Sequence, residues 1–119
     1  CRESADGGLE VNFRVGVDGE VTTSWFCPTH LRSYDGVLHG GVIATLLDSA
    51  MVHVLFARKV VAQTVEMRVR YHRSVQTGRH AEVTARLHSQ FRHLYRLEAG
   101  ISQAGKVCAR AHAKFPAPS

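Results

Sequence analysis

Cysteine is scarce in this sequence, and its few copies follow no pattern. The 119 residues include three cysteines, without a Cys-x-x-Cys pair. An odd, unpatterned set does not make a disulfide framework, so we expect a reducing compartment, the cytoplasm. Cys27 and His30 have the spacing of half a zinc site, but no second half follows, so we expect no metal.

The sequence also lacks a membrane segment. Its most apolar stretch, residues 40–57, contains Asp48 and His53 and is shorter than the ~20 apolar residues that a spanning helix needs. The chain does not open on basic residues followed by an apolar run, which is the pattern of a secretory signal. We therefore expect no association with a membrane.

Positive charge is in excess but is not concentrated. Lys and Arg number 15 against 10 Asp and Glu, a net charge of +5. This excess favours anionic partners, but the basic residues are spread along the chain, so we do not expect nucleic-acid binding. The length and the 45% hydrophobic content predict one domain over residues 1–119, with its core in residues 9–115.

The chain does hold one long apolar helix. Residues 40–57 predict a helix that begins at a glycine pair and ends before Arg58 and Lys59, whose charges suit the C-terminal end of a helix dipole. Apolar side chains occupy nearly every face, so we expect other elements to surround it. Asp48 is its only formal charge, and a buried carboxylate is costly without a partner, so this position needs an explanation.

Apolar and polar residues alternate on both sides of this helix, as in strands with one buried face. Short turn segments between them, such as Asp18-Gly19, Thr77-Gly78 and Ala104-Gly105, favour antiparallel neighbours. The sequence therefore predicts an α+β domain in which an antiparallel sheet of about six strands wraps around one long central helix. The expected strands are residues 9–15, 21–25, 61–71, 81–88, 95–102 and 107–115.

Residues 34–51 and the alternating strand 64–71 resemble the hotdog-fold acyl-CoA thioesterases of the phenylacetate-degradation type, through the motif His39-Gly40-Gly41 followed seven positions later by Asp48. The resemblance spans residues 10–115 in length and element order. It implies the hotdog fold and homodimers whose sheets join edge to edge, often paired into homotetramers. It also implies an active site at the dimer interface that hydrolyses an acyl-CoA thioester to free acid and coenzyme A without a cofactor.

The same resemblance assigns roles to the residues of this motif. The amides of Gly40 or Gly41 would polarise the thioester carbonyl, with the helix dipole behind them. Asp48 of the other subunit would act as general base on water or as a nucleophile that forms a mixed anhydride, and we favour the general base. Thr64 aligns with a Ser or Thr that holds the attacking water in relatives.

Other candidates have plainer alternatives. His39 is a catalytic candidate or a structural donor to its loop, and Ser33, with Arg32, stands where several relatives carry an Asn or Gln that orients the substrate. Arg73 and Arg79 are candidates to bind the phosphates of coenzyme A, or are solvated arginines on a wet strand face.

Two other functions stay open on this fold, because fold alone does not choose among them. One is a non-catalytic module that binds or senses acyl-CoA. The other is a dehydratase or hydratase. That chemistry usually needs a distinct Asp and His pair, and the positions of Asp35 and His39 in the sequence support such a pair only weakly. Asp48 itself has a structural alternative, a carboxylate held by backbone amides or by an Arg across an interface.

Overall fold

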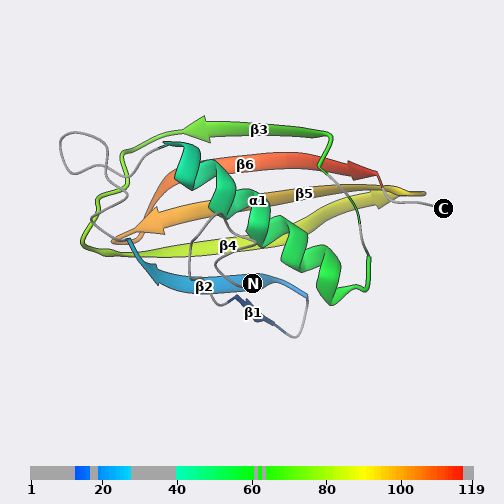
Figure 1. The fold of residues 1–119 in the computed structure, drawn as a ribbon, viewed down its shortest axis with the longest axis horizontal. Helices are drawn as coiled ribbons and strands as arrows, with labels where there is room; N and C mark the ends of the chain where they lie inside the picture. The colour runs from blue at the N-terminus through cyan, green and yellow to red at the C-terminus, as the bar shows by residue number, and fades with distance from the viewer. Residues whose placement is uncertain (1–12, 17–18, 28–39, 61, 63, 117–119) are drawn as a thin grey trace.

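The computed structural model describes residues 13–16, 19–27, 40–60, 62 and 64–116. These residues form one six-stranded antiparallel sheet in the order β1-β2-β4-β5-β6-β3, with one helix, α1, lying across one of its faces (Figure 1). The predicted architecture is therefore confirmed. The elements are β1 (Arg14–Val15), β2 (Val21–Phe26), α1 (Gly40–Ala57), β3 (Glu66–Tyr71), β4 (His80–Phe91), β5 (Leu94–Gln103) and β6 (Lys106–Pro116).

Helix α1 begins and ends at the predicted residues, but the sheet covers only one of its sides. Its fully buried side chains recur every three or four positions and form a single stripe against the sheet. The other side is mostly half-buried, with the Phe13 ring 4.7 Å from that of His53, and Phe56 on it is 52% exposed. Of the helix residues, only Gly41, Thr45, Phe56 and Ala57 are exposed, so most of the helix is covered as expected, although the sheet packs against one side alone. The buried stripe is Ile43, Leu46, Leu47, Ala50, Met51, Val54 and Leu55.

By length and composition, α1 is also apolar enough to cross a membrane, with a mean hydropathy of 1.6. The core helix of a domain passes the same test, and 44% of α1 is buried against the rest of the protein. This burial comes from the sheet face that α1 covers.

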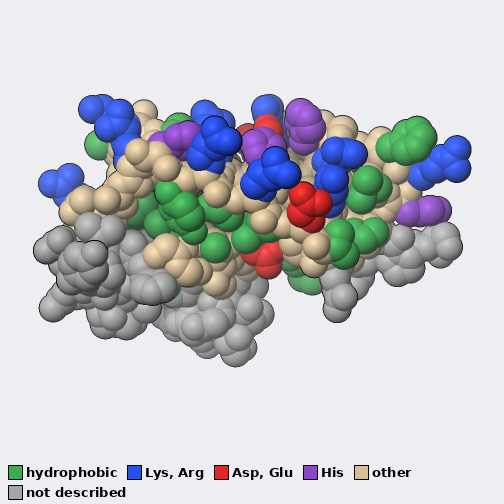
Figure 2. All heavy atoms as spheres, turned by 90° about the horizontal axis from the view of Figure 1, so that it is seen from above, with side chains coloured by type: hydrophobic (Ala, Val, Ile, Leu, Met, Phe, Trp, Pro, Cys, Tyr) green, Lys and Arg blue, Asp and Glu red, His purple; other side chains and the backbone are tan. Residues whose placement is uncertain are grey.

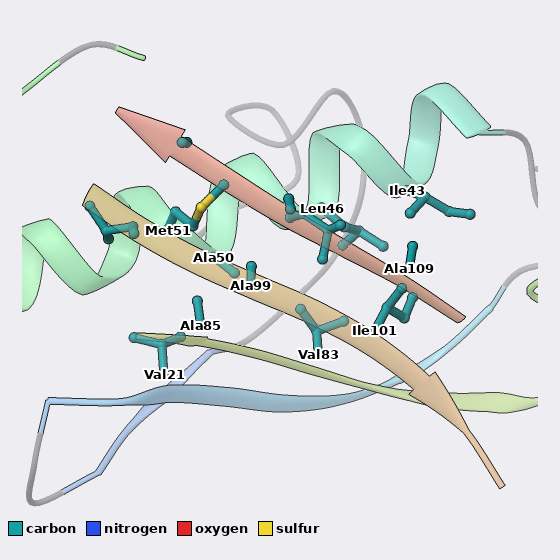
Figure 3. Close-up of a cluster of buried hydrophobic side chains, with 14 of the residues drawn as sticks. Val21, Ile43, Leu46, Ala50, Met51, Val83, Ala85, Ala99, Ile101 and Ala109 are labelled. Carbon is teal, nitrogen blue, oxygen red and sulfur yellow. The ribbon is translucent and has the colours of Figure 1, made fainter. Parts of the chain in front are cut away.

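Small side chains on the sheet make room for the helix. Ala85, Ala99 and Ala111 pair across β4, β5 and β6 and form a row of alanines, all buried. Larger side chains in the neighbouring row, such as Val83 and Ile101, fill the space under the helix (Figure 3). The predicted close approach of the helix to the alanines of the last strand is confirmed, since Ala109 and Ala113 are buried as well.

Strand β3 departs from the predicted pattern because it lies at one edge of the sheet, paired with β6. It begins at Glu66 rather than at residue 61. Val65 and Tyr71, which the alternation placed on the buried face, are 65% and 52% exposed, while Met67 and Val69 are half-buried. The helix contacts β4, β5 and β6 but covers the edge strand only in part, so alternation alone did not ensure burial there.

The turns of the C-terminal half follow the predicted positions. Ala104 and Gly105 have φ values of 52° and 77°, the left-handed pair that a tight two-residue hairpin turn requires. Arg92, with φ at 58°, and His93 form the turn between β4 and β5. The β4–β5 hairpin is longer than the alternation predicted, because the two strands stay paired up to Phe91 and Leu94.

Candidate active site

Asp48 and Thr64 meet beside the helix. Asp48 is half-buried in the middle of α1, outside the stripe that packs on the sheet. Thr64 lies two residues before β3, and its Oγ1 donates a hydrogen bond to Asp48 Oδ1 at 2.6 Å. The Asp48 carboxylate, which needs a partner inside an apolar helix, therefore has one in Thr64, and it is only half-buried.

This pair leaves hydrogen-bonding capacity for a further group. An ionised carboxylate has two oxygens, and Thr64 bonds to Oδ1, so Oδ2 of Asp48 can accept another hydrogen bond. The Thr64 hydroxyl donates its proton to Asp48 but keeps lone pairs of its own. A water molecule placed between the two side chains would therefore find two acceptors.

The start of α1 is held by the end of β3. Tyr71, the last residue of β3, donates a hydrogen bond from its hydroxyl to the carbonyl oxygen of Gly40 at 3.0 Å. Figure 1 shows the end of β3 and the start of α1 at the same end of the sheet. A Cβ added at Gly40 would lie 3.6 Å from the Tyr71 hydroxyl, an ordinary contact, so glycine is not required there by the neighbours within this chain.

Helix geometry separates Gly40 from Asp48. The two residues are eight positions apart, or about 12 Å along a helix that rises 1.5 Å per residue. A carbonyl oxygen bound by an amide at the helix start would lie too far from a water held by Asp48, because reacting atoms must approach to about 3 Å. The amides at the helix start and the Asp48 carboxylate of one chain are therefore too far apart to act on the same carbonyl group.

The remaining candidates are placed as follows. Ser33, Asp35 and His39 lie outside the described residues. Arg73 and Arg79 are exposed, and they flank the connection from β3 to β4, at the end of the sheet where α1 begins (Figure 1). Neither side chain forms an ion pair with a described residue. The structure thus brings together Asp48 and Thr64, and places the arginines at the helix-start end.

The two buried cysteines, Cys27 and Cys108, are both free thiols. Burial, with a smaller contribution from Cys108, raises the pKa of the Cys27 thiol to about 11. Cys27 is therefore protonated near neutral pH and is not a nucleophile. Within the described ranges, no three His, Cys, Asp or Glu side chains are grouped to hold a metal ion.

Tyr71 is a site residue that the sequence analysis missed. The alternation assigned its side chain to the core, and its contact with Gly40 depends on the pairing of β3 with β6, which is not local in sequence. The available signal was a hydroxyl-bearing aromatic residue at the last position of an otherwise aliphatic strand face.

The comparison with protein families bears directly on these residues. The family model described as thioesterase superfamily matches residues 35–109, more than half of the chain. The chain belongs to the thioesterase superfamily. The matched range includes Gly40, Asp48, Thr64 and Tyr71, so the contacts described above lie within the part shared with this superfamily.

Solved structures confirm the hotdog fold of this thioesterase-superfamily chain. RHA08564, a thioesterase superfamily protein, has a TM-score of 0.86 and 25% identity over 90% of this chain, which spans 53% of that longer protein. A phenylacetic acid degradation-related protein from Ralstonia eutropha JMP134 has a TM-score of 0.85 and 21% identity, over 98% of this chain and 91% of that one.

A hypothetical thioesterase protein from Streptococcus pneumoniae TIGR4, solved with coenzyme A, has a TM-score of 0.88 and 18% identity over 99% of this chain and 91% of that one. No curated protein matches the sequence. The predicted resemblance to thioesterases of the phenylacetate-degradation type is confirmed at the level of superfamily and fold.

Proposed function

We propose that this protein hydrolyses an acyl-CoA thioester to a free acid and coenzyme A. The observation that carries the proposal is the 2.6 Å hydrogen bond from Thr64 to Asp48, which fixes a half-exposed carboxylate within the region matched to the thioesterase superfamily. The coenzyme A found with the Streptococcus pneumoniae protein of the same fold supports acyl-CoA as the substrate class.

In this proposal Asp48 is the general base. Thr64 bonds to Oδ1, and Oδ2 accepts a proton from water while the water oxygen attacks the carbonyl carbon of the thioester. The carbonyl oxygen becomes an oxyanion as the new C–O bond forms. When the C–S bond breaks, the sulfur leaves with the electron pair of that bond and takes the proton from Asp48 as coenzyme A thiol, which restores the carboxylate.

The nucleophilic alternative uses the same carboxylate differently. Asp48 would attack the thioester carbonyl and form a mixed anhydride, which water then hydrolyses. The hydrogen bond from Thr64 occupies Asp48 Oδ1, while the lone pairs of the Thr64 hydroxyl and Asp48 Oδ2 together can hold a water molecule beside the carboxylate, which suits proton transfer from water. We therefore propose the general base.

The oxyanion requires donors, and we assign them to the backbone amides of Gly40 and Gly41 at the start of α1, where the positive end of the helix dipole lies. Because Gly40 and Asp48 of one chain are about 12 Å apart, the proposal includes a homodimer in which each site takes its amides from one chain and its carboxylate from the other. Strand β3 supports this arrangement, since it is a sheet edge at which Val65, the residue before the strand, and Tyr71, its last residue, are exposed.

The test is release of free thiol from a panel of acyl-CoA esters. Asp48→Asn keeps the side-chain shape and an oxygen for Thr64 but removes the base, so we expect kcat to fall about 10²- to 10⁴-fold. Glu82→Gln is the matched control, because it neutralises an exposed carboxylate on the sheet face away from α1, and it should retain the wild-type rate.

Each outcome of this assay has a clear meaning. Hydrolysis by Asp48→Asn at the wild-type rate would refute the catalytic assignment. If the wild-type protein binds acyl-CoA but releases no thiol from any ester, the chain is a binding module and not an enzyme. Circular dichroism and the oligomeric state in solution, measured for both variants, separate loss of the base from loss of the fold or of the dimer.

Thr64→Val tests the positioning of the carboxylate. Valine has nearly the same shape as threonine but cannot donate to Asp48, so we expect kcat to fall about tenfold, the equivalent of one hydrogen bond of ~1.4 kcal/mol. The loss should be smaller than that of Asp48→Asn, because the base remains. Thr64→Ser, which restores the hydroxyl, should recover most of the rate, and a rate for Thr64→Ser as low as that of Thr64→Val would contradict this role.

A further inference from the structure

The sheet face turned away from α1 carries two arginines directly opposite each other. Arg70 on β3 and Arg110 on β6 are cross-strand partners, and both are exposed. The Cβ atoms of such partners lie about 5 Å apart, where like charges destabilise a sheet. No described carboxylate lies within ion-pairing distance of either arginine. This pair is therefore an uncompensated cost to the isolated chain.

The carboxylates nearest to this pair already have partners. Glu66 lies 3.5 Å from Lys114 Nζ and 3.7 Å from an Arg68 guanidinium nitrogen. Glu66 therefore compensates cations other than Arg70 and Arg110.

Glu98 is bonded to Arg86 and lies 3.8 Å from a His88 ring nitrogen and 3.5 Å from one of His112. Burial favours its neutral form, but the Arg86 hydrogen bond and the charges of Arg86, His88 and His112 outweigh it and lower the pKa of Glu98. Glu98 is thus an anion whose charge is balanced by Arg86, His88 and His112, and not by Arg70 or Arg110.

The opposed arginines line a hollow of a size suited to a small molecule. Its volume is about 690 Å³, within the range of ordinary ligand sites. Three histidines also line it, and Figure 2, which looks onto the β3 side of the molecule, shows Lys, Arg and His side chains gathered along one side. The charged residues of the lining are Arg68, Arg70, Arg96, Arg110, Lys114 and, as the one carboxylate among the described residues, Glu66.

A second hollow of about 260 Å³ continues from Arg110 over Gly100, the cross-strand partner of Arg110 on β5. Because Gly100 has no side chain, the space beside the Arg110 guanidinium stays open, and an added Cβ there would come no closer than 3.5 Å to another chain atom. Glu20 and Glu98 are the carboxylates of this second lining. The most positive part of the face therefore lies between Arg70 and Arg110.

We propose that this face binds a small molecule that carries two or more adjacent phosphate groups. Guanidinium groups donate paired hydrogen bonds to phosphate oxygens, and two opposed arginines supply this geometry for two neighbouring phosphates. A compact ligand fits better than a nucleic acid strand, since Glu66 and Glu98 interrupt the cations on either side. The site is on the opposite face of the sheet from α1 and Asp48, so it does not rest on the proposed hydrolysis.

The test is titration of the full chain with inorganic tripolyphosphate in about 0.1 M salt, where charges are screened beyond about 10 Å, with binding measured by isothermal titration calorimetry. The variant Arg70→Gln/Arg110→Gln should bind about a hundredfold more weakly than wild type, because each arginine loses hydrogen bonds to a charged group. The matched control Arg14→Gln/Arg92→Gln removes the same charge from β1 and from the β4–β5 turn. Its affinity should change by no more than about threefold, since distant exposed charges are screened.

Several results would overturn the proposal. These are no binding of tripolyphosphate by the wild type, an equal loss in the control, and binding of only an acidic peptide or an oligonucleotide. Removal of a repulsive pair should leave Tm unchanged or raise it. A lowered Tm in the Arg70→Gln/Arg110→Gln variant would instead assign these arginines to the fold and would also overturn the proposal.

Coenzyme A also carries adjacent phosphates, so a parallel titration distinguishes the source of the ligand. If the Arg70→Gln/Arg110→Gln variant loses affinity for both coenzyme A and tripolyphosphate, the phosphates of the coenzyme are a ligand of this face. If it loses affinity for tripolyphosphate alone, the ligand is a free polyphosphate compound. Both results support the proposal, and neither depends on whether the protein releases thiol from an ester.

Discussion

Strand β6 presents two different surfaces to the two sides of the sheet. Ala109, Ala111 and Ala113 are buried toward α1, whereas Arg110 and His112, which alternate with them, are exposed on the other side. On the inner face the limiting quantity is volume, because α1 packs closely on small side chains. On the outer face the limiting quantity is charge. Side chains there extend into solvent, and in the lining of the larger hollow the cations outnumber the carboxylates.

The two faces should therefore respond differently to the same size of chemical change. Substitutions that alter volume should be costly toward α1 and tolerated on the outer face. Substitutions that alter charge on the outer face should change the free energy of unfolding only slightly, and the size of that change should depend on pH. Three variants test this contrast.

The largest effect is expected from a cavity in the core. Phe115 on β6 is fully buried, so Phe115→Ala should lower the free energy of unfolding by about 3–5 kcal/mol. The matched truncation Thr84→Ala, on the outer face of β4, should change it by no more than about 0.5 kcal/mol. Urea unfolding followed by circular dichroism measures both, and similar losses at the two positions would contradict the contrast.

An intermediate effect is expected from overfilling the row of alanines. Ala111 stands between Ala99 on β5 and Val69 on β3 and is fully buried, so Ala111→Leu should cost about 1–3 kcal/mol in unfolding free energy. Thr84→Leu adds bulk on the open face and serves as the control, with a change of about 0.5 kcal/mol or less. A neutral Ala111→Leu would show that the helix is not packed as closely as the structure indicates.

The smallest effect is expected from Glu98, and it should depend on pH. The pKa of Glu98 is lowered in the folded protein, so its carboxylate stabilises the fold above its ordinary value of 4.5, and this contribution is lost as the pH falls through the folded value. Glu98→Gln should therefore unfold more easily by about 1 kcal/mol or less at pH 7, because the pair with Arg86 is partly solvated.

The same variant should approach the wild-type stability in acid. Urea unfolding at pH 7 and again below pH 4.5 measures the convergence, with Glu82→Gln, which neutralises an exposed carboxylate on β4, as a charge-matched control. A difference between Glu98→Gln and wild type that persists at both pH values would show that the carboxylate acts through packing and not through its charge.

Much of this fold could be predicted because its signals are local. The glycine pair and the apolar run fixed α1 to its observed ends, and strict alternation identified the strands that α1 covers. The same rule failed for Val65 and Tyr71, because exposure at an edge strand depends on how far the helix reaches across the sheet. Alternation shows which side chains share a face but not whether anything covers them.

The candidate site was predictable in its parts but not in its contacts. Asp48 and Thr64 were both selected from the sequence. The hydrogen bond between them, however, forms only because the segment between α1 and β3 brings Thr64 back beside the middle of the helix. The contact of Tyr71 with Gly40 joins residues 31 positions apart. The opposition of Arg70 and Arg110 depends on the register between β3 and β6, which no local pattern specifies.

The irregular positions of the sheet determine how this chain can change in length. A strand that gained or lost one residue would exchange its apolar and charged side chains between the two faces, because they alternate with a period of two. Two places already absorb such a step: β4 has one extra residue between Leu87 and Ser89, and β6 has one extra residue, Cys108, opposite Ile101 and Ser102 of β5. Single-residue insertions or deletions should survive there, while elsewhere in the paired strands only changes of two residues would keep both faces intact.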